Sequence, residues 1–74
     1  KTVFFGSGSE GPYRVGATGI VPGSETVSVN GGELVRGGGY EISYSKGEIT
    51  FDSVIGQGDR VLVEYEVAEG GPGS

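Results

Sequence analysis

The sequence predicts an all-β domain: a small antiparallel β-sandwich of the immunoglobulin-like kind, with six or seven short strands and no helix. Two observations support this prediction. Apolar side chains recur at every second residue in one short segment after another, and no stretch has the apolar spacing of a helix. Glycine makes up 17 of the 74 residues, against about 7% in average proteins, and most glycines fall between the alternating segments, where turns are expected.

Eight segments are strand candidates, and their inward faces define the expected core. Tyr40 and Ile42 share one face of a candidate strand, and Ile49 and Phe51 share one face of the next. Ile55 is expected to fill the core from a loop. The candidate strands cover residues 2–5, 12–15, 18–21 (the weakest), 26–29, 33–36, 40–44, 48–52 and 60–67.

The clearest turn signal is the pair Asn30-Gly31. An Asn-Gly pair suits the two-residue loop of a β-hairpin, because both central positions of that turn need a positive φ. A loop of two residues would place Leu34 opposite Val27 on the two strands that it joins. The register of this hairpin is therefore predicted together with its turn.

Composition argues against several classes of function. The chain has no cysteine and no histidine, which removes disulfides, the commonest metal ligands and the commonest general base. Ten acidic residues stand against five scattered basic ones, whereas a nucleic-acid partner requires clustered Lys and Arg. No apolar run approaches the roughly 20 residues of a membrane span. We therefore expect no nucleic-acid partner, no membrane insertion, no cofactor, no metal and no enzymatic activity.

One motif indicates a different function. Gly6, Gly8 and Gly11 have the G-x-G-x-x-G spacing of a dinucleotide-binding loop, and Glu33 lies at about the distance of the acid that binds the ribose. Such a loop works only where its third glycine opens a helix whose N-terminus meets the pyrophosphate. Here the strand-like residues 12–15 follow, so we interpret the motif as a coincidence in a glycine-rich loop.

Paired carboxylates are the other candidate for chemistry. Glu64 and Glu66 project from the same side of the last expected strand, and Asp52 and Asp59 flank a glycine-containing loop. Such groups could hydrolyse a glycoside or bind calcium, but they do not form a dense cluster. A solvated acidic face that blocks unwanted edge pairing is the preferred interpretation.

The N-terminal segment has an unusual apolar pattern. Val3, Phe4 and Phe5 are adjacent large apolar residues, and a glycine-rich stretch separates them from the compact region. Two adjacent phenylalanines of a strand cannot both face one core. We therefore hypothesise that Val3, Phe4 and Phe5 lie along a neighbouring subunit and add a strand to its edge. The alternative is an ordinary first strand, with one ring in the core and one at the interface between sheets.

The expected organisation has three parts. Residues 1–10 are an N-terminal strand with a glycine tether, and residues 11–68 are the β-sandwich domain. Residues 69–74 have the Gly, Pro and Ser composition of a flexible linker or tail. The chain opens on Lys1 rather than Met, which indicates a processed chain or a piece of a longer one.

Four stretches together indicate a family resemblance: EGPYRV, IVPGSETVSVNGGELVRG, YEISYSKGEITF and GQGDRVLVEYE. They resemble a β-sandwich repeat module of large bacterial cell-surface and secreted proteins. The resemblance implies extended extracellular proteins with adhesive or scaffolding roles and no active site. Two acids that are usual in the module are replaced here by Gly39 and Ser43, so any turn capping or ion contact by those acids is not carried over.

The expected function is that of a structural extracellular module, a repeat or subunit of a bacterial surface array or fibre. Its partners would be copies of itself or neighbouring modules, contacted through strand edges. The alternative is an adhesion module that binds a carbohydrate or a protein ligand. Tyr13 is the candidate contact residue of that alternative because it is the least constrained tyrosine, whereas Tyr40, Tyr44 and Tyr65 are expected to be half-buried packing residues.

Overall fold

A computed structural model describes residues 1–68 and shows seven strands in two antiparallel sheets, with no helix among these residues and hence none suited to crossing a membrane. The predicted all-β class and sandwich architecture are confirmed. The expected linker, residues 69–74, lies outside the described residues. The strands are β1 (Thr2–Phe5), β2 (Tyr13–Arg14), β3 (Thr26–Val29), β4 (Gly32–Leu34), β5 (Tyr40–Ser43), β6 (Glu48–Phe51) and β7 (Arg60–Glu64).

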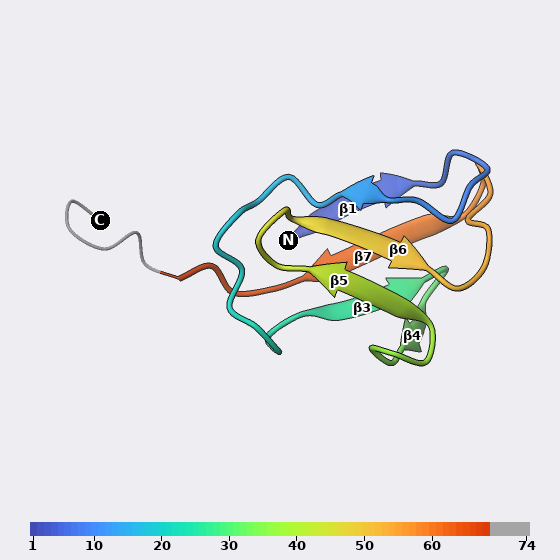
Figure 1. Cartoon of the computed structure of the whole chain (residues 1–74). Coiled ribbons are helices and arrows are strands. Elements are labelled where there is room, and N and C mark those ends of the chain that lie inside the picture. Colours follow the sequence, from blue (N-terminus) through green and yellow to red (C-terminus); the bar gives the residue numbers. More distant parts are fainter. Residues whose placement is uncertain (69–74) are drawn as a thin grey trace.

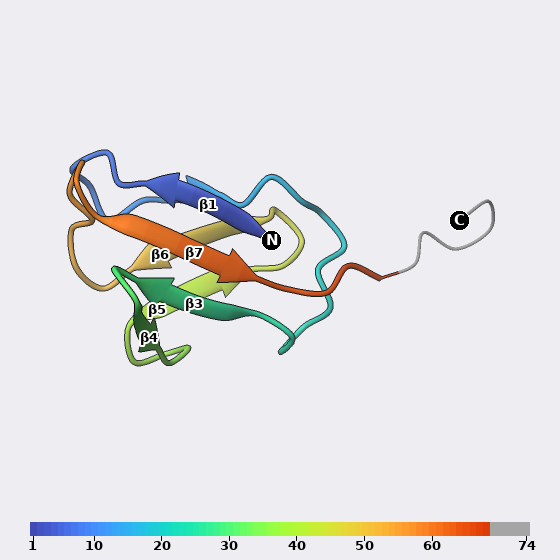
Figure 2. The same cartoon turned by 180° about the vertical axis from the view of Figure 1, so that it is seen from behind.

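The two sheets have the strand orders β1-β7-β3-β4 and β2-β6-β5. Figure 1 shows β5 and β6 lying across the face of the larger sheet, and Figure 2 shows the larger sheet from behind. The first strand pairs with the last, so that Thr2 lies opposite Val63 and Phe5 opposite Arg60. Immunoglobulin constant-type domains instead keep their first strand beside their second. The likeness to that fold is therefore one of architecture and not of connectivity.

The core lies between the two sheets and uses the alternation seen in the sequence. Val27 lies opposite Leu34, as predicted, and Ile55 fills the core from the β6–β7 loop with 5% of its surface exposed. Tyr44 and Tyr65 are half-buried against the core, as expected, whereas Tyr40, also expected to be half-buried, is fully buried. The buried apolar residues are Val15, Ile20, Val27, Tyr40, Ile49, Phe51, Ile55, Val61 and Val63.

The β3–β4 hairpin has the predicted two-residue loop. Asn30 and Gly31 have φ angles of 52° and 87°, as a turn of this type requires. The Asn30 amide also donates a hydrogen bond to Asp59 Oδ1 at 2.9 Å, and Asn30 Oδ1 accepts one from the Arg60 backbone N–H at 2.9 Å. The same turn residue therefore also fixes the chain where it enters β7.

One candidate strand, residues 18–21, does not form. Gly19 has a φ of 74°, and extended backbone does not continue through a positive φ. Only Ile20 makes a bridge, to Val67. Because the chain beyond Glu64 bonds to this segment instead of to the sheet, β7 ends three residues earlier than expected.

Residues 1–10 are part of the sandwich, which corrects the expected division between residues 1–10 and 11–68. β1 pairs with β7 over residues 2–5. The glycine stretch that follows is held against the β6–β7 loop, because the backbone N–H groups of Gly6 and Gly8 donate to the carbonyl oxygens of Asp59 at 3.1 Å and Ile55 at 2.9 Å. In this structure the segment is an edge strand of its own domain.

A buried carboxylate joins the loop before β3 to strand β5. Glu25 is 8% exposed, and its two oxygens accept hydrogen bonds from the hydroxyls of Tyr40 at 2.9 Å and Tyr44 at 2.8 Å. Arg36 donates to the Tyr44 hydroxyl and lies 6.0 Å from the centre of the Tyr44 ring. Burial raises the pKa of the Glu25 carboxyl. The hydrogen bonds to the carboxylate and the Arg36 charge lower the pKa, and their combined effect is larger. The pKa of Glu25 therefore lies below its ordinary value of 4.5.

Glu25→Gln is expected to destabilise the domain by about 1–2 kcal/mol near neutral pH, because a charged acceptor of two hydrogen bonds becomes neutral. The pKa of Glu25 is lower in the folded than in the unfolded chain. Its contribution to stability is therefore present above the ordinary pKa and is lost as the pH falls through the folded pKa. Urea unfolding at about pH 6 and about pH 3 should show a larger loss of stability in the unmodified chain than in the variant.

Glu33→Gln is the matched control, because Glu33 is exposed on β4 and takes part in no side-chain hydrogen bond within residues 1–68. This variant should keep the acid sensitivity of the unmodified chain. An unchanged acid sensitivity in Glu25→Gln would contradict the role assigned to this carboxylate.

Candidate interaction surface

The outer face of the four-stranded sheet has an exposed apolar strip along β1. Val3 is 41% exposed and Phe5 is 58% exposed, because alternate side chains of a strand point to opposite faces. Leu62 of β7, which is half-buried, lies opposite Val3, and exposed Arg60 lies opposite Phe5. We call Val3, Phe5 and Leu62 the β1 strip. Arg60 places one positive charge beside it.

The β1 strip lies next to an unpaired strand edge. β1 is an end strand of its sheet, so its side away from β7 has no strand partner within residues 1–68. Natural β-proteins commonly protect such edges with charged residues, prolines or bulges, whereas the outward residues of β1 are Val3 and Phe5. The combination marks this edge as a candidate interaction surface.

The structure separates the three predicted assembly residues. Val3 and Phe5 point outward, but Phe4 points inward and is half-buried. The Phe4 ring stacks on the Tyr13 ring of β2, with 5.3 Å between ring centres. Phe4 therefore packs between the two sheets, as in the ordinary-strand alternative, and only Val3 and Phe5 are available to a partner.

Tyr13 is strongly constrained, so the expectation that it is the least constrained tyrosine is wrong. Its ring also packs edge-on against Phe51, with ring centres 5.8 Å apart. Its hydroxyl donates to the Ser9 carbonyl oxygen at 2.7 Å and accepts from the Ser7 backbone N–H at 3.0 Å. The glycine-rich loop folds back onto this hydroxyl, an arrangement that strand alternation does not reveal.

A cleft of about 350 Å³ opens on the opposite side of the sandwich. Asp52 and the two glycines Gly38 and Gly39 line it together with apolar side chains. A Cβ atom at Gly39 would lie 3.1 Å from the side chain of Leu34, so the glycine run leaves room that side chains would fill. We call this hollow the β4 cleft, and its apolar walls are Val29, Leu34, Phe51, Val54 and Ile55.

The β1 strip and the β4 cleft lie on opposite edges of the domain. β1 and β4 are the two end strands of one sheet, and Figure 2 shows β7 and β3 between them. On the β1 side, the stacked rings of Phe4 and Tyr13 fill the space between the sheets. On the β4 side no such pair is present in the described part of the chain, and the space between the sheets stays open as the cleft.

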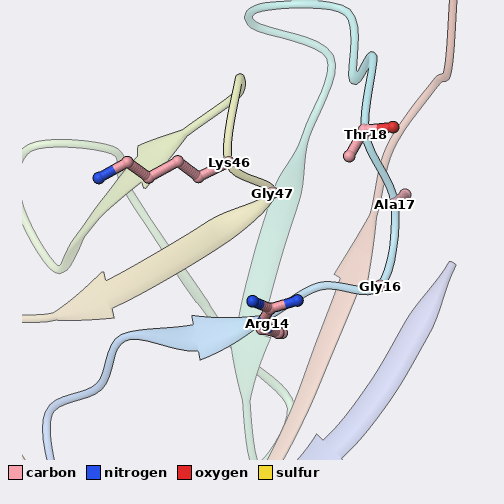
Figure 3. Close-up of a pocket in the computed structure, with 6 residues that line it drawn as sticks. All are labelled: Arg14, Gly16, Ala17, Thr18, Lys46 and Gly47. Carbon is pink, nitrogen blue, oxygen red and sulfur yellow. The ribbon is translucent and has the colours of Figure 1, made fainter.

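A second hollow, of about 280 Å³, lies between the end of β2 and the β5–β6 turn. Arg14 and Lys46 are among its lining residues, and an anion site would need their two charges to converge. Figure 3 shows the Lys46 side chain extending away from Arg14 and Thr18. The two positive charges do not converge, so the geometry does not build a site there.

The acidic candidates do not come together either. Within residues 1–68, no three Asp or Glu side chains lie close enough to hold a metal ion. Asp59 instead has a structural role, because it accepts hydrogen bonds from Asn30 and from the Gly56 backbone N–H, and these bonds lower the pKa of Asp59. The glycine motif of residues 6–11 is followed by strand β2 rather than by a helix, as predicted.

The fold and this surface define a small β-sandwich domain with an exposed apolar strip on one edge and an apolar cleft on the other. Over residues 1–69 the chain matches a family model described as Domain of unknown function (DUF8818), and it belongs to this family. The matched region includes β1 together with the rest of the sandwich. Searches of the curated proteins and of the solved structures gave no significant match.

Proposed function

We propose that this domain is a structural module of a bacterial extracellular or cell-surface array or fibre, and that it contacts neighbouring copies or modules through β1. The observation that supports this most directly is the β1 strip, in which Val3 and Phe5 are exposed beside an unpaired strand edge. The extracellular and bacterial setting rests on the sequence resemblance of residues 11–66.

The energetics fit a weak contact that is repeated many times. Burying a Val or Phe side chain fully contributes about 1.5–3 kcal/mol, so two such residues supply a few kcal/mol per contact. Association costs at least about 4 kcal/mol in lost freedom of motion. A single contact of this kind is therefore weak, but linked modules raise each other's effective concentration and strengthen it.

The proposal differs from strand donation in one respect. β1 stays in its own sheet, paired with β7, and presents its outer face and open edge to a neighbour. The adhesion alternative relied on Tyr13, whose ring and hydroxyl are both engaged within the chain. We therefore propose assembly through β1 rather than ligand binding at Tyr13.

Sedimentation velocity at protein concentrations up to the millimolar range, where a weak single contact becomes populated, tests the proposal. The unmodified chain should associate as its concentration rises. Phe5→Lys should weaken this association about tenfold or more, because a charge replaces the ring that the contact between copies would bury. Circular dichroism checks that the variant keeps the fold.

Val67→Lys is the matched control. Val67 is 49% exposed and bridges to Ile20, away from β1, so its replacement should leave association unchanged. The proposal would be overturned if the unmodified chain stays monomeric at every concentration tested. It would also be overturned if the Phe5→Lys variant associates as strongly as the unmodified chain.

A further inference from the structure

We propose that Phe5 of one copy inserts into the β4 cleft of a second copy, so that modules associate side by side and head to tail. This inference rests on the proposed function and adds to it the surface that receives the β1 strip. Shape, charge and the position of the two surfaces support it independently.

The cleft suits an aromatic ring. A cavity of about 150 Å³ lined by apolar side chains accepts benzene, and the β4 cleft has a volume of about 350 Å³ with walls that include Val29, Leu34 and Phe51. Phe5 is the exposed phenylalanine of the described chain, whereas Phe4 and Phe51 pack into the core. The chain therefore presents a ring on one edge and an apolar hollow on the other.

The charges beside the two surfaces are complementary. Arg60 is exposed beside Phe5, and Asp52 is exposed at the cleft. Among residues 1–68, neither side chain forms a hydrogen bond within the domain. Insertion of Phe5 into the cleft would bring Arg60 toward Asp52 of the second copy.

The positions of the two surfaces determine the kind of assembly. Because the β1 strip and the β4 cleft lie on opposite edges of the larger sheet, each contact leaves one free strip and one free cleft. A contact between two different surfaces that does not close on itself produces a filament rather than a dimer. The expected product is therefore a lateral row of sandwiches.

A mixing experiment tests the pairing directly. The variant Phe5→Lys loses the ring and keeps the cleft. The variant Val54→Lys keeps the ring and places a charge in the cleft, at a side chain that is 58% exposed. Each variant alone should be monomeric by sedimentation velocity. An equimolar mixture should form a dimer of defined mass, because it offers one intact ring and one intact cleft.

The outcomes separate this inference from the proposed function. If the unmodified chain does not associate, the proposed function itself fails. If the unmodified chain associates and Val54→Lys alone associates equally well, assembly through β1 stands but the cleft is not its partner. An equimolar mixture that stays monomeric, when the unmodified chain associates, also overturns the pairing.

An exchange of charges gives a second test that leaves the Phe5 ring and the apolar walls of the cleft unchanged. Arg60→Asp alone and Asp52→Lys alone should each weaken association about two- to fivefold, the range expected for an exposed ion pair. The chain with both substitutions should recover the association of the unmodified chain. Additive weakening in the double variant would contradict the contact between Arg60 and Asp52.

Discussion

Ile49→Ala is expected to lower the free energy of unfolding by about 3 kcal/mol, within the range of about 2–5 kcal/mol seen for such core truncations. Ile49 has no exposed surface and lies on β6, between Tyr13 of β2 and Ile42 of β5. Its truncation leaves a cavity, and β2, β5 and β6 would all have to shift to fill it. A domain of this length has a total stability of about 4–11 kcal/mol, so the variant should lose a large part of it.

Urea unfolding followed by tyrosine fluorescence or circular dichroism measures this effect. Ile49→Val removes one methyl group and should cost about 1 kcal/mol. Val35→Ala is the surface control, because Val35 is 73% exposed and its change should stay within about 0.5 kcal/mol. A cost for Ile49→Ala no larger than that for Val35→Ala would contradict the burial of Ile49 in the core.

Gly6→Ala should destabilise the domain by about 1–3 kcal/mol, the range for added atoms in a filled site. A Cβ atom at Gly6 would overlap the backbone carbonyl oxygens of Ile55 and Gly56. These are main-chain atoms, so the β6–β7 loop would have to move, and with it the hydrogen bond from Gly6 to the Asp59 carbonyl oxygen. The φ of Gly6 is not positive, so the effect comes from space rather than from backbone strain.

Gly58→Ala is the matched control for this substitution. Apart from its own chain neighbours, no heavy atom lies within 4 Å of a Cβ built at Gly58, and its φ is not positive either. Alanine there should be neutral or stabilise by up to about 1 kcal/mol, because it restricts the unfolded chain. Equal thermal unfolding midpoints for the two variants would contradict the close approach of β1 to the β6–β7 loop.

The features predicted correctly depend on neighbours in sequence. The Asn30-Gly31 pair specifies its own turn and thereby the pairing of Val27 with Leu34, because a two-residue loop leaves one register. Alternation along β5 and β6 likewise places Tyr40 and Ile49 in the core, since a strand's side chains point to its two faces in turn.

The features that were missed depend on residues far apart in the chain. Alternation shows which side chains of residues 2–5 share a face. It does not show that their partner strand is β7, which lies near the other end of the sequence. The β4 cleft arises where β3, β4, β6 and two loops meet, so no single segment signals it. The positive φ at Gly19 ends local pairing at a point that apolar patterning does not mark.

The pairing of the first strand with the last also determines how the domain would respond to mechanical force. Thr2 lies opposite Val63, so the start of β1 and the end of β7 lie at the same end of the sandwich (Figure 1). Tension applied to these two points would load the hydrogen bonds between the strands one after another, as in a zipper, rather than all together in shear. Bonds loaded singly yield at low force. Tension through these two points would therefore separate β1 from β7 before it disturbs the rest of the sandwich.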